Sequence, residues 1–116
     1  MVLCHQTLHH IVAQDAALAE FYRVLKPGGV LLLAESAKAF IHSWIIRLLF
    51  RHPMHVQRTA EEYVDMVRDA GLDVVPERIS LPFLWWSRPD LGMKDWLGLA
   101  PAPRRQETLV NIVAFK

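Results

Sequence analysis

The chain is poor in cysteine and has almost no excess of charge of either sign. Its single cysteine, Cys4, excludes a disulfide within the 116 residues and fits a reducing, cytoplasmic location. Thirteen lysines and arginines stand against twelve aspartates and glutamates, which gives a net charge of +1. Such a balance provides no extended positive surface for nucleic acid or for an anionic membrane. We therefore expect neither of them as a partner.

Long hydrophobic runs and glycine-rich turns are missing as well. The densest apolar stretch, residues 40–50, contains His42, Ser43 and Arg47 and has about half the length that a membrane span needs. No basic segment followed by an apolar core opens the chain, so we expect no secretion signal. None of the five glycines stands in a G-x-G-x-x-G turn, the motif that places a dinucleotide pyrophosphate at a helix end.

The first third of the chain contains alternating strand-like and helix-like segments. Residues 2–4 are apolar from the outset, as in a buried strand. Because domains rarely begin inside a strand, we expect the fold to start before Met1. Residues 16–25 repeat apolar side chains at helical spacing, with Asp15 as the expected N-cap. Residues 30–34 form an apolar run between turn residues, which is typical of a strand covered on both faces.

Two further helices are predicted in the middle of the chain. Residues 40–50 carry an apolar stripe that predicts one helix facing the core or, as an alternative, a lid over an apolar acceptor. Thr59 and Glu62 have the spacing of a capping box, which marks the start of the next helix. Gly71 supplies the left-handed residue that ends it.

The last third of the chain predicts extended structure around a long loop. Residues 72–84 contain two prolines, which restrict them to an edge or a broken strand. Residues 85–106 are rich in Trp and Pro and predict a long loop with a short helix near residues 91–97. Residues 109–115 predict a final strand. The alternation of strands and helices indicates an α/β sheet with right-handed crossovers.

Two motifs, in this order, resemble those of class I methyltransferases, the family that uses S-adenosylmethionine. Leu8-His9-His10 resembles the element that follows the family's fourth strand. Arg23-Val-Leu-Lys-Pro-Gly-Gly29 resembles the element that precedes its fifth strand. Residues 111–116 resemble the antiparallel strand that ends the family's sheet. The resemblance covers the chain except residues 85–106.

The resemblance implies a fold and a reaction. The fold is a partial Rossmann-like α/β sheet, the family's fourth to seventh strands with flanking helices, so that residues 1–116 form the C-terminal half of a methyltransferase domain. The reaction is methyl transfer from S-adenosylmethionine to a small-molecule acceptor. The family's glycine-rich turn and the acidic residue that binds the ribose are not among these residues, and we expect them before Met1.

Ligands of open α/β sheets bind beyond the carboxyl ends of the strands. The resemblance therefore implies cofactor contacts for Cys4, His5, Gln6, Thr7 and His9. The catalytic group is not predicted. His9 is one candidate for a general base, because imidazole titrates near neutral pH. A structural role for His9 at the strand–helix turn is an equally open alternative.

Two residues are expected on the acceptor side of such a site. Glu35 follows the predicted strand at its carboxyl end, so it could touch the substrate. Trp44 lies on the predicted helix that comes next and could line an apolar acceptor. Either residue could instead serve the fold alone.

A metal site is not predicted, although the chain has six histidines. Cys4, His5, His9 and His10 lie close together in the sequence, but no second Cys or His group stands at ligand spacing. A non-catalytic function is also open. The chain could be a methyltransferase-like remnant that folds with a partner or as a homodimer, because its first strand would otherwise have an unpaired edge.

Overall fold

The computed structural model describes residues 1–82, 92–99 and 107–116, apart from the side chains of Trp44 and Ile45. Its strands are β1 (Val2–His5), β2 (Val30–Ser36), β3 (Ile79–Ser80) and β4 (Leu109–Phe115). Its α-helices are α1 (Gln14–Val24), α2 (Lys38–Ile41), α3 (Trp44–Leu49), α4 (Ala60–Asp69) and α5 (Met93–Trp96). Short 3-10 helices are η1 (Leu8–His10), η2 (Met54–Val56) and η3 (Pro76–Arg78).

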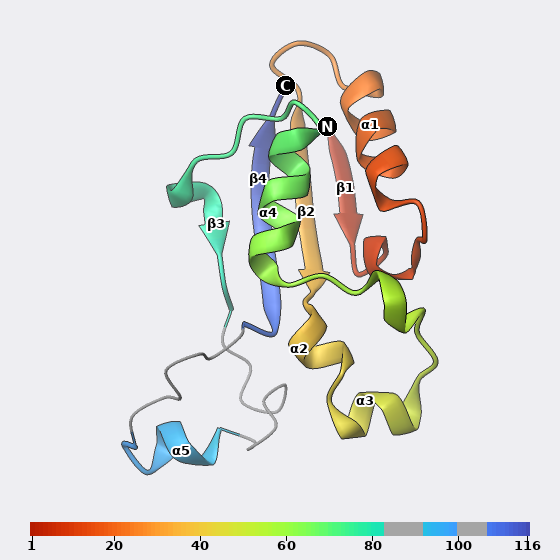
Figure 1. Cartoon of the computed structure of the whole chain (residues 1–116). Helices are drawn as coiled ribbons and strands as arrows, with labels where there is room; N and C mark the ends of the chain where they lie inside the picture. Colours follow the sequence, from red (N-terminus) through yellow and green to blue (C-terminus); the bar gives the residue numbers. More distant parts are fainter. Residues whose placement is uncertain (83–91, 100–106) are drawn as a thin grey trace.

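The described strands form one sheet in the order β1-β2-β4-β3 (Figure 1). β1 and β2 run parallel, whereas β4 runs antiparallel to both β2 and β3. A parallel pair needs a crossover connection, which η1 and α1 supply here. The mixed α/β sheet confirms the predicted fold class, and β4 confirms the antiparallel final strand.

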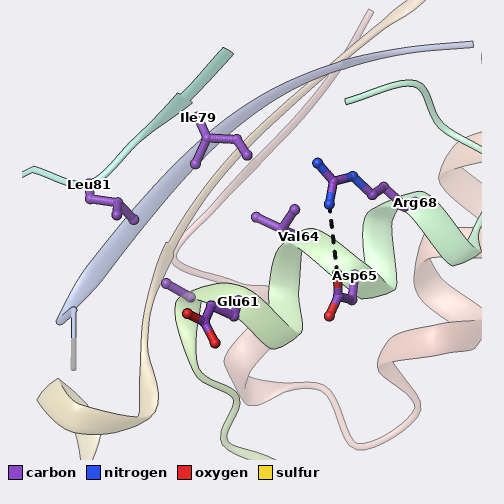
Figure 2. A pocket seen from close by; sticks show the side chains of 7 residues that line it. Glu61, Val64, Asp65, Arg68, Ile79 and Leu81 are labelled. Atoms are coloured by element: carbon purple, nitrogen blue, oxygen red, sulfur yellow. Dashed lines mark ion pairs between the residues drawn. The ribbon is translucent and has the colours of Figure 1, made fainter. Parts of the chain in front are cut away.

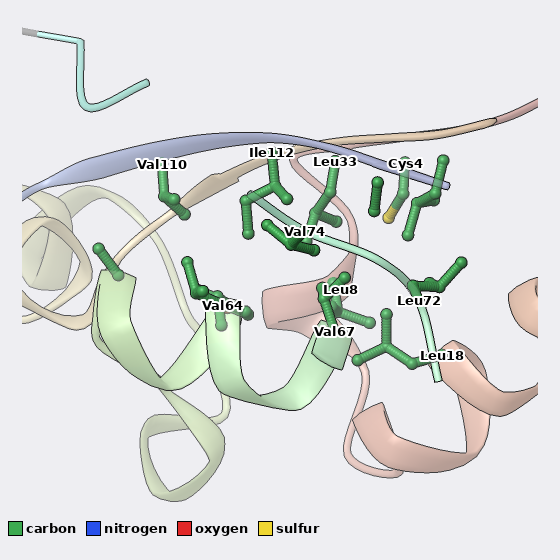
Figure 3. Packing of buried hydrophobic residues seen from close by; sticks show 14 of the residues in the cluster. Cys4, Leu8, Leu18, Leu33, Val64, Val67, Leu72, Val74, Val110 and Ile112 are labelled. Carbon is green, nitrogen blue, oxygen red and sulfur yellow. The ribbon is translucent and has the colours of Figure 1, made fainter. Parts of the chain in front are cut away.

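One face of the sheet carries the hydrophobic core. Because side chains alternate along a strand, every second residue of β1, β2 and β4 points to this face. Helices α1 and α4 contribute to the same cluster from below the sheet in Figure 3. Leu8, Leu18, Leu33, Tyr63 and Val67 are each at most 1% exposed. Burial contributes about 1.5–3 kcal/mol for each large apolar side chain, so this layer stabilises the fold.

The opposite face of the sheet, here called the open face, has no helix over it in the described part of the chain. Leu3, Leu32 and Val113 stand in register across β1, β2 and β4. Leu3 is 66% exposed, and the other two are partly exposed. Parallel strands in α/β proteins are normally covered on both faces. An apolar row on an uncovered face is therefore a surface on which more protein is expected to pack.

Glycine builds the turn between α1 and β2. Gly28 has a φ of 74°, in the left-handed region that glycine adopts without strain. Its N–H donates to the carbonyl of Lys116 at 2.7 Å, which ties the turn to the end of β4. A Cβ on Gly29 would lie 2.7 Å from the carbonyl oxygen of Lys26, so only glycine fits there. The motif at residues 23–29 thus directs β2 into the sheet and is structural.

The start of α1 differs from the prediction. The helix begins at Gln14, and Ala13 occupies the N-cap position without a side-chain bond, so the assignment of Asp15 as N-cap is wrong. Gln14 is buried, and its Nε2 donates to the carbonyls of Leu8 and Val56, each at 3.1 Å. These bonds hold the first residue of the helix against the core. Asp15 lies in the first turn, where its charge complements the helix dipole.

Helix α4 begins and ends as predicted. The Thr59 hydroxyl accepts the N–H of Glu62 at 3.2 Å, and the Glu62 carboxylate accepts the N–H of Thr59 at 2.7 Å. This reciprocal pair is the capping box. Gly71 follows the helix with a φ of 90°, and a Cβ there would lie 3.3 Å from the ring of Tyr22.

The single helix predicted over residues 40–50 is wrong, because the structure has two short helices, α2 and α3. Ser43 between them is extended, with a ψ of 147°, so the helical path restarts after it. The change of direction buries Ile46, whereas Leu48 and Leu49 are 76% and 64% exposed. The apolar residues continue at helical spacing through residues 40–50, but the chain packs as two short helices rather than one.

The region after α4 is largely irregular. It contains η3, the two-residue edge strand β3 and an isolated bridge between Asp73 and Phe115, in agreement with a broken strand. Helix α5 confirms the short helix predicted near residues 91–97. The rest of the predicted loop, residues 83–91 and 100–106, lies outside the described residues.

Candidate functional site

The candidate site lies at the carboxyl edge of the parallel pair β1 and β2. The chain leaves β1 through Gln6, whose φ of 50° is in the left-handed region. The N–H of Gln6 donates to the carbonyl of Ala34 at 2.8 Å, and the hydroxyl of Ser36 donates to Oε1 of Gln6 at 2.6 Å. The tight turn after β1 is therefore bonded to the end of β2, where open α/β sheets bind their ligands.

A buried carboxylate holds the loop that follows. Oε1 of Glu35 accepts the backbone N–H groups of Thr7 and Leu8, each at 2.8 Å. Oε2 lies 2.6 Å from Nδ1 of His9, and the Cys4 thiol lies 3.6 Å from Oε1. Glu35 is only 1% exposed, so these groups take the place of water around it. We describe Glu35 as a positioning residue for the loop.

The hydrogen bonds to Glu35 decide its charge. Burial alone would raise the pKa of Glu35, but hydrogen bonds from His9 and from the N–H groups of Leu8 and Thr7 outweigh it and lower the pKa. Glu35 is therefore ionised at neutral pH. Burial and the negative charge of Glu35 raise the pKa of the Cys4 thiol to about 11. Cys4 is consequently protonated at neutral pH and is no nucleophile.

Two buried glutamines hold the same loop by its carbonyl groups. Nε2 of Gln14 donates to the carbonyl of Leu8 at 3.1 Å. Nε2 of Gln57 donates to the carbonyls of His9 and Pro53, each at 2.9 Å. The loop is thus anchored through its donors by Glu35 and through its acceptors by the glutamines. Sequence reasoning missed both glutamines, because no local pattern distinguishes them from exposed ones.

The structure places the residues predicted to contact cofactor in two groups. The side chains of His5 and Thr7 are exposed and that of Gln6 is partly exposed, so a ligand at this edge can reach them. Cys4 and His9 are 5% and 3% exposed and point into the Glu35 network. The loop therefore offers a ligand the side chains of His5, Gln6 and Thr7, while the buried pair, Cys4 and His9, fixes its shape.

Neither of the two residues predicted on the acceptor side is seen to face a ligand in the described structure. Glu35 is at the expected edge but faces the loop after β1 rather than solvent. Trp44 opens α3, and its side chain lies outside the part of the chain that the structure describes.

Two more histidines lie beside His9. The ring centroid of His10 is 4.1 Å from that of His9 and 4.9 Å from that of His52, and the centroids of His9 and His52 are 5.4 Å apart. Burial and the neighbouring imidazole of His9 lower the pKa of His10. Burial and the imidazoles of His10 and His9 lower the pKa of His52 in the same way. Sequence reasoning noted His9 and His10 but missed His52, which is distant in the chain.

A separate groove of about 230 Å³ lies between α4 and β3 (Figure 2). Val64, Ile79 and Leu81 make it apolar, and Arg68 pairs with Asp65 at 3.8 Å on its rim. It sits at the β3 edge of the sheet, whereas the Glu35 network lies between β1 and β2. Because undescribed residues follow directly after Pro82, we assign no ligand to this groove.

Comparisons with known proteins agree with this architecture. A family model described as a methyltransferase domain matches residues 1–33. The structure is similar to an S-adenosylmethionine dependent methyltransferase from Mesorhizobium loti, with a TM-score of 0.61 and 12% identity over 98% of this chain and 60% of that one. It is also similar to the complex of the Haloferax volcanii Trm112 methyltransferase activator with a protein described as a methyltransferase, with a TM-score of 0.60 and 19% identity over 98% of this chain and 52% of that one. No curated protein matches the sequence.

These matches confirm the resemblance: the described sheet and helices have a class I methyltransferase-like fold. The chain spans 60% and 52% of the two solved proteins, so it corresponds to little more than half of each. None of the described helices has the length and apolar character that crossing a membrane requires.

Proposed function

We propose that the chain takes part in methyl transfer from S-adenosylmethionine to a small-molecule acceptor. The observation that carries the proposal is the loop from Gln6 to His9, which Glu35 fixes at the carboxyl edge of β1 and β2. A methyltransferase requires chiefly that the donor and the acceptor are held close and in line. A loop whose backbone donors and acceptors are both anchored is suited to holding a ligand in one position.

S-adenosylmethionine, when bound, supplies a methyl group activated by a sulfonium charge. The exposed side chains of His5 and Thr7, with Gln6 between them, would line one side of such a molecule. Cys4 and His9 would not touch the cofactor but would fix the shape of the loop through their bonds to Glu35. The turn that binds the rest of the cofactor would come from sequence before Met1. We propose that the chain is the C-terminal part of such an enzyme, and its single cysteine fits a cytoplasmic location.

The acceptor side would be formed by the segment after β2. Leu48, Leu49 and Phe50 are 76%, 64% and 57% exposed at the end of α3, which gives this segment an apolar surface. Trp44 begins the same helix. We propose that α3 forms an apolar wall for the acceptor, which corresponds to the lid considered for residues 40–50. We assign no catalytic base.

A titration with S-adenosylmethionine tests the proposal. Isothermal titration is performed on the chain alone and on the chain joined to the sequence that precedes Met1 in its gene. We expect weak or no binding by the chain alone and measurable binding by the extended protein, because only the latter has both sides of the pocket. Tight binding by the chain alone would contradict the division of the pocket. A folded extended protein that does not bind would contradict the methyltransferase proposal.

A non-catalytic function is the second candidate, and the open face favours it. Leu3, Leu32 and Val113 form an apolar row that the described helices leave uncovered. Among the described strands, β1 also has a neighbour on one side only. A second copy or a partner protein could cover both surfaces. One of the similar solved structures, described as a methyltransferase, is a complex with the Trm112 methyltransferase activator of Haloferax volcanii, which supports partner binding by this chain.

Size-exclusion chromatography separates the two candidates. A chain that remains a stable dimer and does not bind S-adenosylmethionine after extension favours the non-catalytic function. A chain that becomes monomeric and binds the cofactor once extended favours methyl transfer.

A further inference from the structure

Three imidazoles converge next to the Glu35 network. His9 and His10 belong to η1, and His52 lies just before η2, at a distant point of the sequence. One ring nitrogen from each of the three side chains lies within 4.8 Å of the other two. His9 is buried, His52 is partly exposed and His10 is exposed, so the cluster opens to solvent on one side.

The carboxylate of Glu35 orients the buried member of this cluster. Oε2 of Glu35 lies 2.6 Å from Nδ1 of His9. An ionised carboxylate only accepts hydrogen bonds, so Nδ1 carries a proton and Nε2 is the ring nitrogen left to bind a metal. A carboxylate behind the far nitrogen is the arrangement that usually orients a metal-binding histidine. Glu35 is itself fixed by the N–H groups of Thr7 and Leu8.

Gln57 brings the distant member to the other two. Its Nε2 donates to the carbonyls of His9 and Pro53, each at 2.9 Å, and it is 4% exposed. One buried amide thus joins the η1 segment to the residue that follows His52. The rings of His10 and His52 are nearly parallel, with 19° between their planes. Two buried side chains outside the cluster, Glu35 and Gln57, therefore hold the segments that carry its histidines.

We propose that His9, His10 and His52 form a binding site for a divalent transition metal of the zinc class. Imidazole is a preferred ligand of zinc, copper, nickel and iron. In a tetrahedral zinc site with bonds of about 2.0–2.1 Å, the ligand nitrogens are about 3.3 Å apart. The nitrogens lie within 4.8 Å of one another, so metal binding would require the rings of the two more exposed histidines to turn toward His9.

Three protein ligands leave one coordination position open. Zinc sites of this composition hold water or substrate in the fourth position, whereas structural sites use four protein ligands. The open position would face solvent past His10, the exposed member of the cluster. The proposal departs from the sequence-based expectation, which considered only Cys4, His5, His9 and His10 and predicted no metal, because the structure adds His52 to the group. A metal on Nε2 of His9 would also prevent that nitrogen from acting as a base.

Titration of the full chain with Zn²⁺, in competition with a chromogenic chelator, tests the proposal. We expect one ion per chain, and a visible absorption spectrum of tetrahedral type when Co²⁺ replaces Zn²⁺. His52→Ala should weaken Zn²⁺ binding by at least about tenfold, the loss found even for groups behind the ligands. His55→Ala is the matched control, since His55 is an exposed histidine on η2 outside the cluster. Its affinity should equal that of the unmodified chain.

The proposal is overturned if the chain shows no saturable binding of one Zn²⁺, or if His52→Ala and His55→Ala have the same effect. If His52→Ala does not fold by circular dichroism, His10→Ala replaces it, because His10 is exposed and its removal leaves the core intact. The titration contains no S-adenosylmethionine. Its outcome is therefore independent of the proposed methyl transfer.

Discussion

At the scale of single residues, Glu35 determines the shape of the loop after β1. Both of its oxygens are engaged, by two backbone N–H groups and by His9. Glu35→Gln keeps an oxygen for the N–H groups of Thr7 and Leu8, but it removes the negative charge and turns an N–H₂ group toward Nδ1 of His9. We expect a loss of about 1.5–3 kcal/mol in the free energy of unfolding, the range for buried bonds to a charged group, measured by urea denaturation. Glu77→Gln on η3 is the control and should stay within about 0.5 kcal/mol. Equal effects of the two variants would contradict the role of Glu35.

The lowered pKa of Glu35 also predicts a dependence of stability on pH. Between the unfolded pKa of a glutamate, about 4.3, and its lower folded pKa, the unfolded chain binds more protons. The contribution of Glu35 to the free energy of unfolding is therefore complete above this range and is lost as the pH drops through it. Urea denaturation between pH 6 and pH 3 should give a steeper fall for the unmodified chain than for Glu35→Gln. Parallel curves would show that Glu35 is not the group responsible.

Only part of this residue-scale picture could be predicted. Glu35 was expected at the right edge because it follows an apolar run. Its bond to His9 spans 26 positions, and no local pattern reports such a contact. Gln14 and Gln57 donate to backbone carbonyls inside the fold. Glutamines are mostly exposed in proteins, so the residue type alone predicts a surface position for both.

At the scale of elements, the ends of α4 were predictable because local chemistry defines them. The capping box and Gly71 depend on residues within the same few turns. The break between α2 and α3 was not predictable, because no Gly or Pro marks it. It follows from burial of Ile46 by packing, which a periodic pattern does not contain. Tertiary contacts decide such short helices more than propensity does.

Gly71 gives a prediction at this scale. Gly71→Ala places a Cβ at a φ of 90° and 3.3 Å from the ring of Tyr22. The left-handed conformation alone costs an L-residue about 1–2 kcal/mol, and the contact adds to it. Gly28→Ala is the matched control, since its φ is 74° and no atom lies within 4 Å of the added Cβ. Urea denaturation should show the greater destabilisation for Gly71→Ala. The reverse order would indicate that Tyr22 moves aside without cost.

At the scale of the whole molecule, the open face predicts association. Leu3 is the most exposed member of the row that crosses three strands. We expect the isolated chain to self-associate in analytical ultracentrifugation. Leu3→Lys should weaken the association by at least about tenfold, since burial of one leucine contributes about 1.5–3 kcal/mol. Leu48→Lys alters a leucine of α3 that is 76% exposed and should have little effect. A chain that is monomeric at all concentrations would contradict the prediction.

The central claim is that the loop after β1 lies against S-adenosylmethionine in the complete fold. Photolabelling tests it most directly. The protein, with any sequence that its gene encodes before Met1, is irradiated with isotopically labelled S-adenosylmethionine and digested, and the labelled peptides are identified by mass spectrometry. We predict label within residues 4–10, and its loss when excess unlabelled cofactor is present. Label confined to other parts of the protein, although the cofactor binds, would contradict the claim.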